Sequence, residues 1–111
     1  MPKYQPALDV VFHALADPTR RAVIERLGRG PRAVSQLAEP FDMAMPSFLQ
    51  HLRVLERAGL IHSRKTGRVR TVTLAPRQLK SAERWLHTQR DLWEQRLDQL
   101  DVLLITLKEQ P

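Results

Sequence analysis

The sequence lacks cysteine, long apolar runs and a signal peptide, and each absence excludes a class of protein. Without cysteine the chain can form neither a disulfide bond nor a thiolate metal site. That composition fits the reducing cytoplasm, where we expect the protein to be located. The apolar runs are a few residues long, far short of the roughly 20 residues that span a bilayer, and the first residues, MPKYQPALD, lack a hydrophobic stretch. We therefore expect no membrane partner.

The positive charge of the chain is concentrated in one segment. The 111 residues predict a single domain over residues 1–111. Residues 44–70 hold six basic side chains and one acidic side chain, which gives +5 of the total net charge of +6. A basic patch that is so localised is typical of a surface that binds phosphate groups. The alternative is a solvated basic surface without a partner.

Hydrophobic periodicity in the first half of the chain predicts short helices. Asp17 and Pro18 are suited to cap and begin the second helix. Gly28 and Gly59 are suited to end the second and the fourth helix, and Gly30-Pro31 is expected to form a loop. Apolar residues recur at helical spacing over residues 7–16, 18–27, 34–40 and 45–58.

A basic β-hairpin is predicted immediately after the fourth helix. Residues 61–65 and 69–74 are rich in β-branched side chains, and Thr66-Gly67-Arg68 is suited to the turn between them. A helix that leads directly into a basic hairpin is how a winged helix-turn-helix presents itself to duplex DNA. The fold class predicted is therefore mainly α with a small β-hairpin. It is a winged helix-turn-helix of about five helices plus a two-stranded wing, with a DNA-binding core at residues 7–74.

The last predicted element is a long helix over residues 76–109 that we expect to mediate dimerisation. Its apolar residues advance by alternating steps near three and four, a heptad-like pattern over roughly 30 residues. So long a stripe exceeds what the short helices before it can cover, so a second copy of the chain is the expected partner. The alternative is an intramolecular core helix with an exposed tail. The predicted dimer interface comprises apolar residues of the first and last helices: Leu8, Val11, Phe12, Trp85, Leu86, Trp93, Leu97, Leu100 and Leu104.

Several segments form an ordered set that covers almost the whole chain. They are Asp17-Pro18-Thr19-Arg20-Arg21, His51-Leu52-Arg53-Val54-Leu55-Glu56 with Ala58-Gly59-Leu60-Ile61, and Gly67-Arg68 with Arg70. Together they resemble the second helix, the recognition helix and the wing of the ArsR/SmtB family of winged-helix bacterial repressors. The tail, with Trp85-Leu86 and Trp93-Glu94, is similar to a metal-independent subgroup whose final helix has a W-L…W-E-x-R-L-D-x-L pattern. This resemblance implies a homodimeric DNA-binding regulator.

The helix at residues 45–58 is expected to enter the major groove with its N-terminus first. The amide of Gln50 can pair with adenine N6 and N7, whereas Leu49, where the family usually has a hydroxyl, offers only apolar contact, for example with a thymine methyl group. His51 and Arg53 are expected on backbone phosphate, and the wing cations on phosphate or in a minor groove. The predicted DNA-binding residues are Met45, Ser47, Leu49, Gln50, His51, Arg53, Arg64, Lys65, Arg68 and Arg70.

Metal sensing and catalysis have little support in the sequence. The resemblance implies that a metal-responsive member would carry paired cysteines on the third helix or Asp/His pairs on the last. The last helix offers His87, Asp91 and Glu94 on one face, which we interpret as solvated side chains. No Ser–His–acid order and no glycine-rich phosphate loop indicates an enzyme. We expect no catalytic residue, no cofactor and no metal, with a metal-responsive repressor using these three residues as an alternative.

The sequence thus predicts a homodimeric transcriptional regulator that binds double-stranded DNA, with repression as the expected mode. Because dimerisation fixes the spacing of two recognition helices, we expect an imperfect palindromic operator with half-sites about one helical turn apart. The competing interpretation is a winged-helix protein–protein interaction module whose basic surface meets an acidic partner. A palindromic preference in a selection from random duplexes separates the two.

Overall fold

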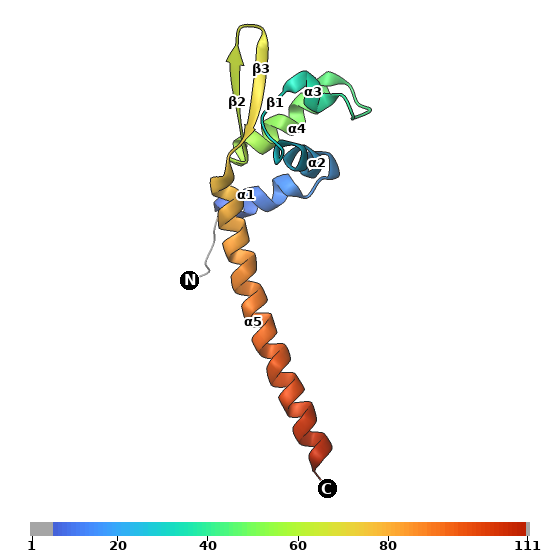
Figure 1. Cartoon of the computed structure of the whole chain (residues 1–111), viewed down its shortest axis with the longest axis vertical. Helices are drawn as coiled ribbons and strands as arrows, with labels where there is room; N and C mark the ends of the chain where they lie inside the picture. The colour runs from blue at the N-terminus through green and yellow to red at the C-terminus, as the bar shows by residue number, and fades with distance from the viewer. Residues whose placement is uncertain (1–5, 111) are drawn as a thin grey trace.

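A computed structural model describes residues 6–110 of the chain. The predicted absence of a signal peptide rests partly on residues 1–5, which lie outside the described residues. The elements follow one another as α1 (Pro6–Leu15), α2 (Pro18–Leu27), β1 (Arg32–Ala33), α3 (Val34–Ala38), α4 (Met45–Arg57), β2 (Ile61–Thr66), β3 (Val69–Leu74) and α5 (Pro76–Glu109). The helices and the hairpin confirm the predicted winged helix-turn-helix (Figure 1).

The sheet has three strands rather than the two that the sequence predicts. Its order is β1-β3-β2, and both pairings are antiparallel. Arg32 pairs with Val72 and Ala33 with Thr71, directly after the expected loop at Gly30-Pro31. A strand of two residues has no periodicity of its own, and only β3, which lies far along the chain, provides its hydrogen-bonding partner. The addition anchors the base of the wing to the segment that leads into α3.

The core lies where α1, α2, α3, α4 and the base of the sheet meet. Phe48 and Leu55 of α4 are fully buried, as expected from their helical spacing, and the core includes Leu37 of α3 and Val72 of β3. Burying a side chain of this size contributes about 1.5–3 kcal/mol. Among the residues whose burial is described, no polar or charged side chain is fully buried. The recognition helix is therefore held rigidly by one apolar face, and its other faces remain exposed.

Gly59 makes the sharp exit from α4 into the wing. Its φ angle is +74°, a left-handed conformation that side chains with a Cβ atom rarely adopt. A Cβ atom at this position would lie 2.9 Å from Cγ of Gln78 in the first turn of α5. Gly28, by contrast, follows α2 with a right-handed φ of −60°, so it ends that helix without the left-handed turn. The tight passage at Gly59 fixes where the wing begins relative to α4.

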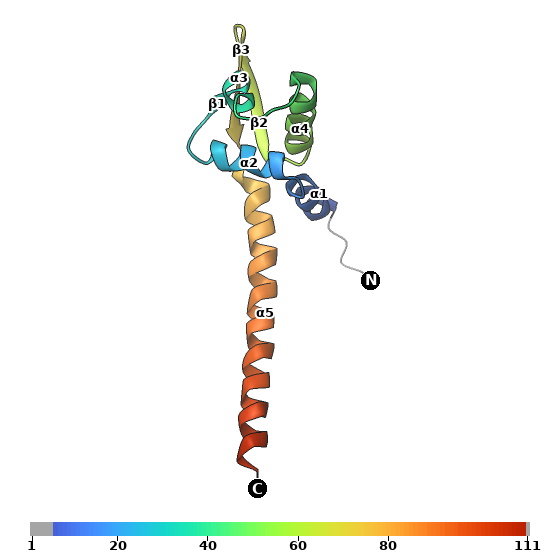
Figure 2. The same ribbon diagram turned by 90° about the vertical axis from the view of Figure 1, so that its right-hand side faces the viewer.

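Helix α5 projects far beyond the rest of the molecule. The chain measures 77 × 34 × 22 Å, and both views show α5 and the wing pointing in opposite directions from the helical head (Figures 1 and 2). The 34 residues of α5 correspond to about 51 Å at 1.5 Å per residue. None of the helices among residues 6–110 is long and apolar enough to cross a membrane.

The structure assigns the predicted interface residues of α1 to different environments. Val11 has 0% exposure inside the core of the single chain, so its side chain there packs within the protomer and leaves no exposed surface. Phe12 is half-buried, and its ring meets that of Trp85 edge to face with centroids 5.6 Å apart. Leu8 is also half-buried against the core. Because Val10, on the same helix, is 44% exposed, α1 keeps an apolar face that is open to solvent.

Candidate DNA-binding interface

The recognition helix begins with an uncapped, exposed turn. Ala44 is the N-cap residue and makes no side-chain hydrogen bond, as its methyl group dictates, while Pro46 lies in the first turn. Met45 and Ser47 are exposed here. The free N–H groups of a helix start and its positive dipole end attract phosphate. The turn predicted to enter the groove is therefore accessible and suited to an anion.

Gln50 and Arg53 form a pair on the exposed face of α4. Arg53 Nη1 donates a hydrogen bond to Oε1 of Gln50 at 2.8 Å, so the two side chains that were predicted to contact base and phosphate are ordered together. Leu49 is different, because it is half-buried against the core and lines a cleft of about 350 Å³ between α4 and the wing. Only part of its side chain remains available for the predicted apolar contact.

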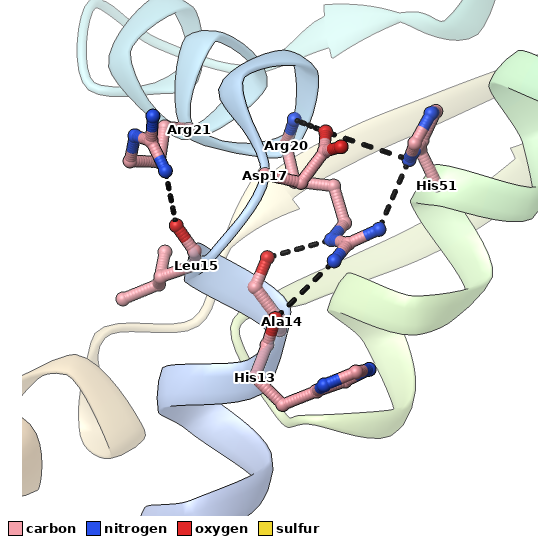
Figure 3. A network of polar contacts seen from close by, with 7 residues as sticks. All are labelled: His13, Ala14, Leu15, Asp17, Arg20, Arg21 and His51. Carbon is pink, nitrogen blue, oxygen red and sulfur yellow. Dashed lines mark hydrogen bonds and ion pairs between the residues drawn. The ribbon is translucent and has the colours of Figure 1, made fainter.

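His51 lies in a network that joins three helices (Figure 3). Its Nδ1 atom lies 3.2 Å from Nη1 of Arg20 and 3.7 Å from Oδ2 of Asp17. A guanidinium group only donates hydrogen bonds, so Arg20 can bond to Nδ1 when that atom carries no proton, whereas a protonated Nδ1 would instead face Oδ2 of Asp17. The His51 side chain is 23% exposed. The side chain faces the start of α2 and does not belong to the exposed pair of Gln50 and Arg53. Its contacts therefore hold α4 against α2.

Arg20 connects this network to the end of α1. Its Nε atom donates to the carbonyl oxygen of Ala14 at 2.6 Å, and its Nη2 atom donates to that of His13 at 3.2 Å. These carbonyl groups belong to the last turn of α1, where helical partners are missing and a cation is favoured by the helix dipole. Arg20 therefore links the end of α1 to the middle of α4.

Asp17 completes the network as the N-cap of α2. Its Oδ2 atom accepts a hydrogen bond from the N–H of Arg20 at 3.0 Å, as the predicted capping role requires. Partial burial alone would raise the pKa of the carboxyl group. The hydrogen bond from Arg20 and the charges of His51 and Arg20 outweigh it, so the pKa of Asp17 lies below its usual value of 3.8. The carboxylate thus remains ionised at neutral pH.

The wing carries its cations on different sides. Gly67, with a φ of +62°, and Arg68 form the two-residue turn between β2 and β3. Lys65 lies opposite Arg70 and Arg64 lies opposite Thr71. Since side chains alternate along a strand, Lys65 and Arg70 share one face of the hairpin and Arg64 points to the other. All four basic residues are exposed, and Arg68 at the tip is the farthest from the core.

The face of the wing that is turned toward α4 holds contacts that the sequence reasoning missed. Ser63 Oγ donates to Oε1 of Glu56 at 3.1 Å, and Arg70 Nη1 donates to Oγ of Ser63 at 2.9 Å. Arg70 is thus engaged within the protein. The sequence offered one signal, since Glu56 is the single acidic residue in a strongly basic segment.

The three residues of the alternative metal site on α5 make contacts along the exposed surface of that helix. His87 Nε2 lies 3.3 Å from Oδ2 of Asp91, and Arg90 Nε lies 4.0 Å from Oε1 of Glu94. Glu94 thus pairs with an arginine, and among residues 6–110 no three His, Cys, Asp or Glu side chains gather as a metal site requires. These four side chains make exposed polar contacts along the helix, and contacts of this kind contribute little to stability.

The geometry defines a class: a winged helix-turn-helix protein that presents a recognition helix and a basic wing to duplex DNA. A family model described as a helix-turn-helix domain matches residues 15–64, from the end of α1 into β2. An ArsR family transcriptional regulator of solved structure, RHA00566, is 52% identical with a TM-score of 0.78, covering 85% of this chain and 97% of that one. The chain belongs to the ArsR family, whose members are DNA-binding transcriptional regulators and not enzymes.

Two relatives of known name support this membership. The HTH-type transcriptional regulator Rv2034 of Mycobacterium tuberculosis is 46% identical over 68 residues, which are 61% of this chain and 64% of that protein. The transcriptional repressor SdpR of Bacillus subtilis is 32% identical over 76 residues, which are 68% of this chain and 84% of that protein. The chain therefore matches a little under two thirds of the length of Rv2034 and most of SdpR.

Proposed function

We propose that the protein is a homodimeric repressor that binds an imperfect palindromic operator without the help of a metal ion. The observation that carries this proposal is the unpartnered apolar stripe of α5, attached to a head whose exposed basic groups are on α4 and the wing. Burial of the stripe favours dimerisation, and a dimer can place two recognition helices on one duplex. We propose repression because the relative SdpR is a transcriptional repressor.

The exposed stripe is too large to be a surface feature of a stable monomer. Trp93 lies in the middle of α5, and its side chain is 64% exposed. Its apolar neighbours on α5 are also largely exposed. Contiguous apolar patches on soluble monomers rarely exceed a few hundred Å². The members of the stripe that remain about half or more exposed in the single chain are Leu86, Trp93, Leu97, Leu100, Leu104 and Leu107.

The charges beside the stripe support an antiparallel pairing of two α5 helices. Glu83, Arg90, Asp101 and Lys108 lie along one flank, with alternating sign. Glu83 and Lys108 are equally far from the midpoint between residues 95 and 96, and so are Arg90 and Asp101. In an antiparallel pair centred there, each acidic residue therefore faces a basic residue of the second copy.

The same register matches the large apolar side chains. Leu86 comes near the level of Leu104 in the second copy, and Trp93 near that of Leu97. A parallel pair would instead place each residue beside its own equivalent, without these opposite charges. We therefore propose that the two heads lie toward opposite ends of the paired helices, so that each contributes one recognition helix to one half-site.

The absence of cysteine makes the orientation directly measurable. Lys108→Cys introduces a single site for a nitroxide spin label. An antiparallel pair in the proposed register places the two labelled backbones about 37 Å apart along the axis, whereas a parallel pair places them about 10 Å apart. A short distance would contradict the antiparallel arrangement, and the absence of any dimer by sedimentation would contradict the dimer.

The operator is tested by selection from random duplexes. The proposed function predicts enrichment of inverted repeats whose half-sites are spaced by one turn of DNA, about 34–36 Å, or by a multiple of it. Enrichment of single half-sites without symmetry would contradict palindromic recognition. No duplex binding at all, together with retention of an acidic protein partner, would favour a protein–protein interaction module instead.

A further inference from the structure

Two hydrogen bonds connect the recognition helix to both strands of the wing. Oε1 of Glu56, near the end of α4, accepts from Ser63 Oγ of β2, and Ser63 Oγ accepts from Nη1 of Arg70 in β3. The distances are 3.1 Å and 2.9 Å. We call these three residues the wing tether. Its three residues line the same cleft between α4 and the sheet as Leu49 does.

The outer part of the wing has no apolar packing that would set its direction. Ile61 and Val72 at its base are buried, but residues 64–70 are all exposed. Cross-strand hydrogen bonds hold the two strands to each other and leave the angle of the hairpin against α4 free. Among the described residues, the side-chain hydrogen bond between α4 and the hairpin is that of Ser63 with Glu56, and Arg70 joins it from within the hairpin.

The charges at the wing tether also need an explanation. Glu56 is the one acidic residue among residues 44–70, and an acid on a phosphate-binding surface weakens binding by repulsion. Arg70 lies directly opposite Lys65 on β2, and two like charges at such a position destabilise a hairpin. Glu56, through Ser63, places a negative charge close to this pair. A structural role for the wing tether accounts for both observations.

We infer that Arg70 is a positioning residue: together with Ser63 and Glu56 it fixes the angle of the wing against the recognition helix, and it does not itself hold phosphate. This inference rests on the proposed binding of duplex DNA. Arg68, at the tip of the same hairpin and without a described protein partner for its side chain, is the matched phosphate-binding residue. The two arginines therefore act on DNA in different ways.

The test compares salt dependence among variants on the selected operator. Arg68→Ala should lower the slope of log K against log salt by about 0.9, the value for one phosphate contact. Arg70→Ala should weaken binding with an unchanged slope. Ser63→Ala, which alters no charge, should weaken binding about threefold to tenfold, the range for one net hydrogen bond. Thr73→Ala, an exposed threonine of β3, is the matched control and should have no effect.

Shared action predicts that the substitutions are not additive. Ser63→Ala combined with Arg70→Ala should bind no more weakly than Arg70→Ala alone. A slope lowered by about 0.9 in Arg70→Ala, with Ser63→Ala silent, would overturn the inference and make Arg70 a phosphate contact. Tighter operator binding by Glu56→Ala would also overturn it, because the acid would then only repel DNA.

A measurement on the free protein separates this inference from the proposed function. Ser63→Ala and Arg70→Ala should both speed amide hydrogen exchange in residues 64–71, with the exchange of α4 unchanged. If the wild-type chain bound no duplex, the proposed function would fail, and faster exchange in the wing would still support the wing tether. Unchanged exchange in both variants would refute the wing tether whether or not the protein binds DNA.

Discussion

Asp17 and His51 are 34 residues apart in the sequence, and their side chains approach to 3.7 Å between Oδ2 and Nδ1. Arg20 lies beside both, and its Nη1 atom is 3.2 Å from Nδ1 of His51, which can accept a hydrogen bond when it carries no proton. If the ring is protonated, Nδ1 becomes a donor, so its contact with Arg20 turns repulsive and Asp17 becomes the favourable partner. The contacts that hold the recognition helix against α2 thus involve Asp17, Arg20 and His51.

The first prediction concerns the cap at Asp17. Asp17→Ala should lower the free energy of unfolding at pH 7 by about 0.5–2 kcal/mol, because the N-cap hydrogen bond is lost. Since the pKa of Asp17 is lower in the folded chain than in the unfolded chain, ionised Asp17 stabilises the fold above the unfolded pKa. That contribution is lost as the pH falls below about 3.8 through the folded pKa.

Denaturant unfolding of wild type and Asp17→Ala across pH 2–7 measures this effect. The difference between the two proteins should shrink toward acid pH. Asp9→Ala, at an exposed acid in the first turn of α1, is the control for a change of net charge. A difference that grew on acidification would reverse the assigned sign of the Asp17 contribution.

The second prediction separates folding from pairing. Val11→Ala should lower the free energy of unfolding by about 1–3 kcal/mol, because it leaves a cavity in the core, with little direct effect on dimer affinity. Trp93→Ala should leave the protomer folded and raise the dimer dissociation constant roughly 30-fold or more, as expected for an aromatic anchor.

Sedimentation and circular dichroism together distinguish these outcomes. The contrast depends on burial, since Val11 is fully buried and Trp93 largely exposed in the single chain. A Trp93→Ala protein with wild-type dimer affinity would exclude Trp93 from the interface. A Val11→Ala protein that was monomeric with an unchanged free energy of unfolding would show that Val11 contributes to the dimer interface.

The third prediction assigns a specific role to Gln50. Gln50→Ala should lose about 1–3 kcal/mol against the preferred operator, the value for one good base contact, with little change on random DNA. Arg53→Ala is the informative comparison, because Arg53 donates a hydrogen bond to Oε1 of Gln50. This substitution should weaken binding to both duplexes by similar amounts. Equal losses on both duplexes for Gln50→Ala would assign it to the backbone.

The fourth prediction is that operator binding does not depend on a metal ion. His87 is engaged with Asp91, and Glu94 with Arg90, on an open helix face. A chelator should leave operator affinity unchanged, and His87→Ala should behave like the control His62→Ala. Saturable zinc binding that changed DNA affinity and disappeared in His87→Ala would establish the metal-responsive alternative.

Local patterns in the sequence predicted most of the elements, because helical spacing, prolines and glycines act within a few residues. The bounds of α2 and of β3 agree with the prediction, and α5 covers residues 76–109 as expected. Strand β1 was missed, because its pairing with Thr71 and Val72 depends on a distant part of the chain. The same reason explains Val11, whose burial is a property of several helices packed together.

The candidate site was predictable in location and less so in the role of each residue. The concentration of positive charge identified α4 and the wing, and the helical period placed Gln50 on an exposed face. The contacts of His51 and Arg70 could not be derived, because they involve side chains 31 and 7 residues away whose approach is set by packing and strand register. Charge alone indicates a phosphate contact and cannot tell it from an internal one.

The length of α5 has a consequence for how steeply the regulator responds to its own abundance. When the binding-competent form is a pair and the single chain leaves its apolar stripe in water, the amount of that form rises with the square of the chain concentration in the dilute range. A twofold change in synthesis then changes operator occupancy by up to about fourfold. The projecting helix thus converts a small difference in expression into a larger difference in transcription.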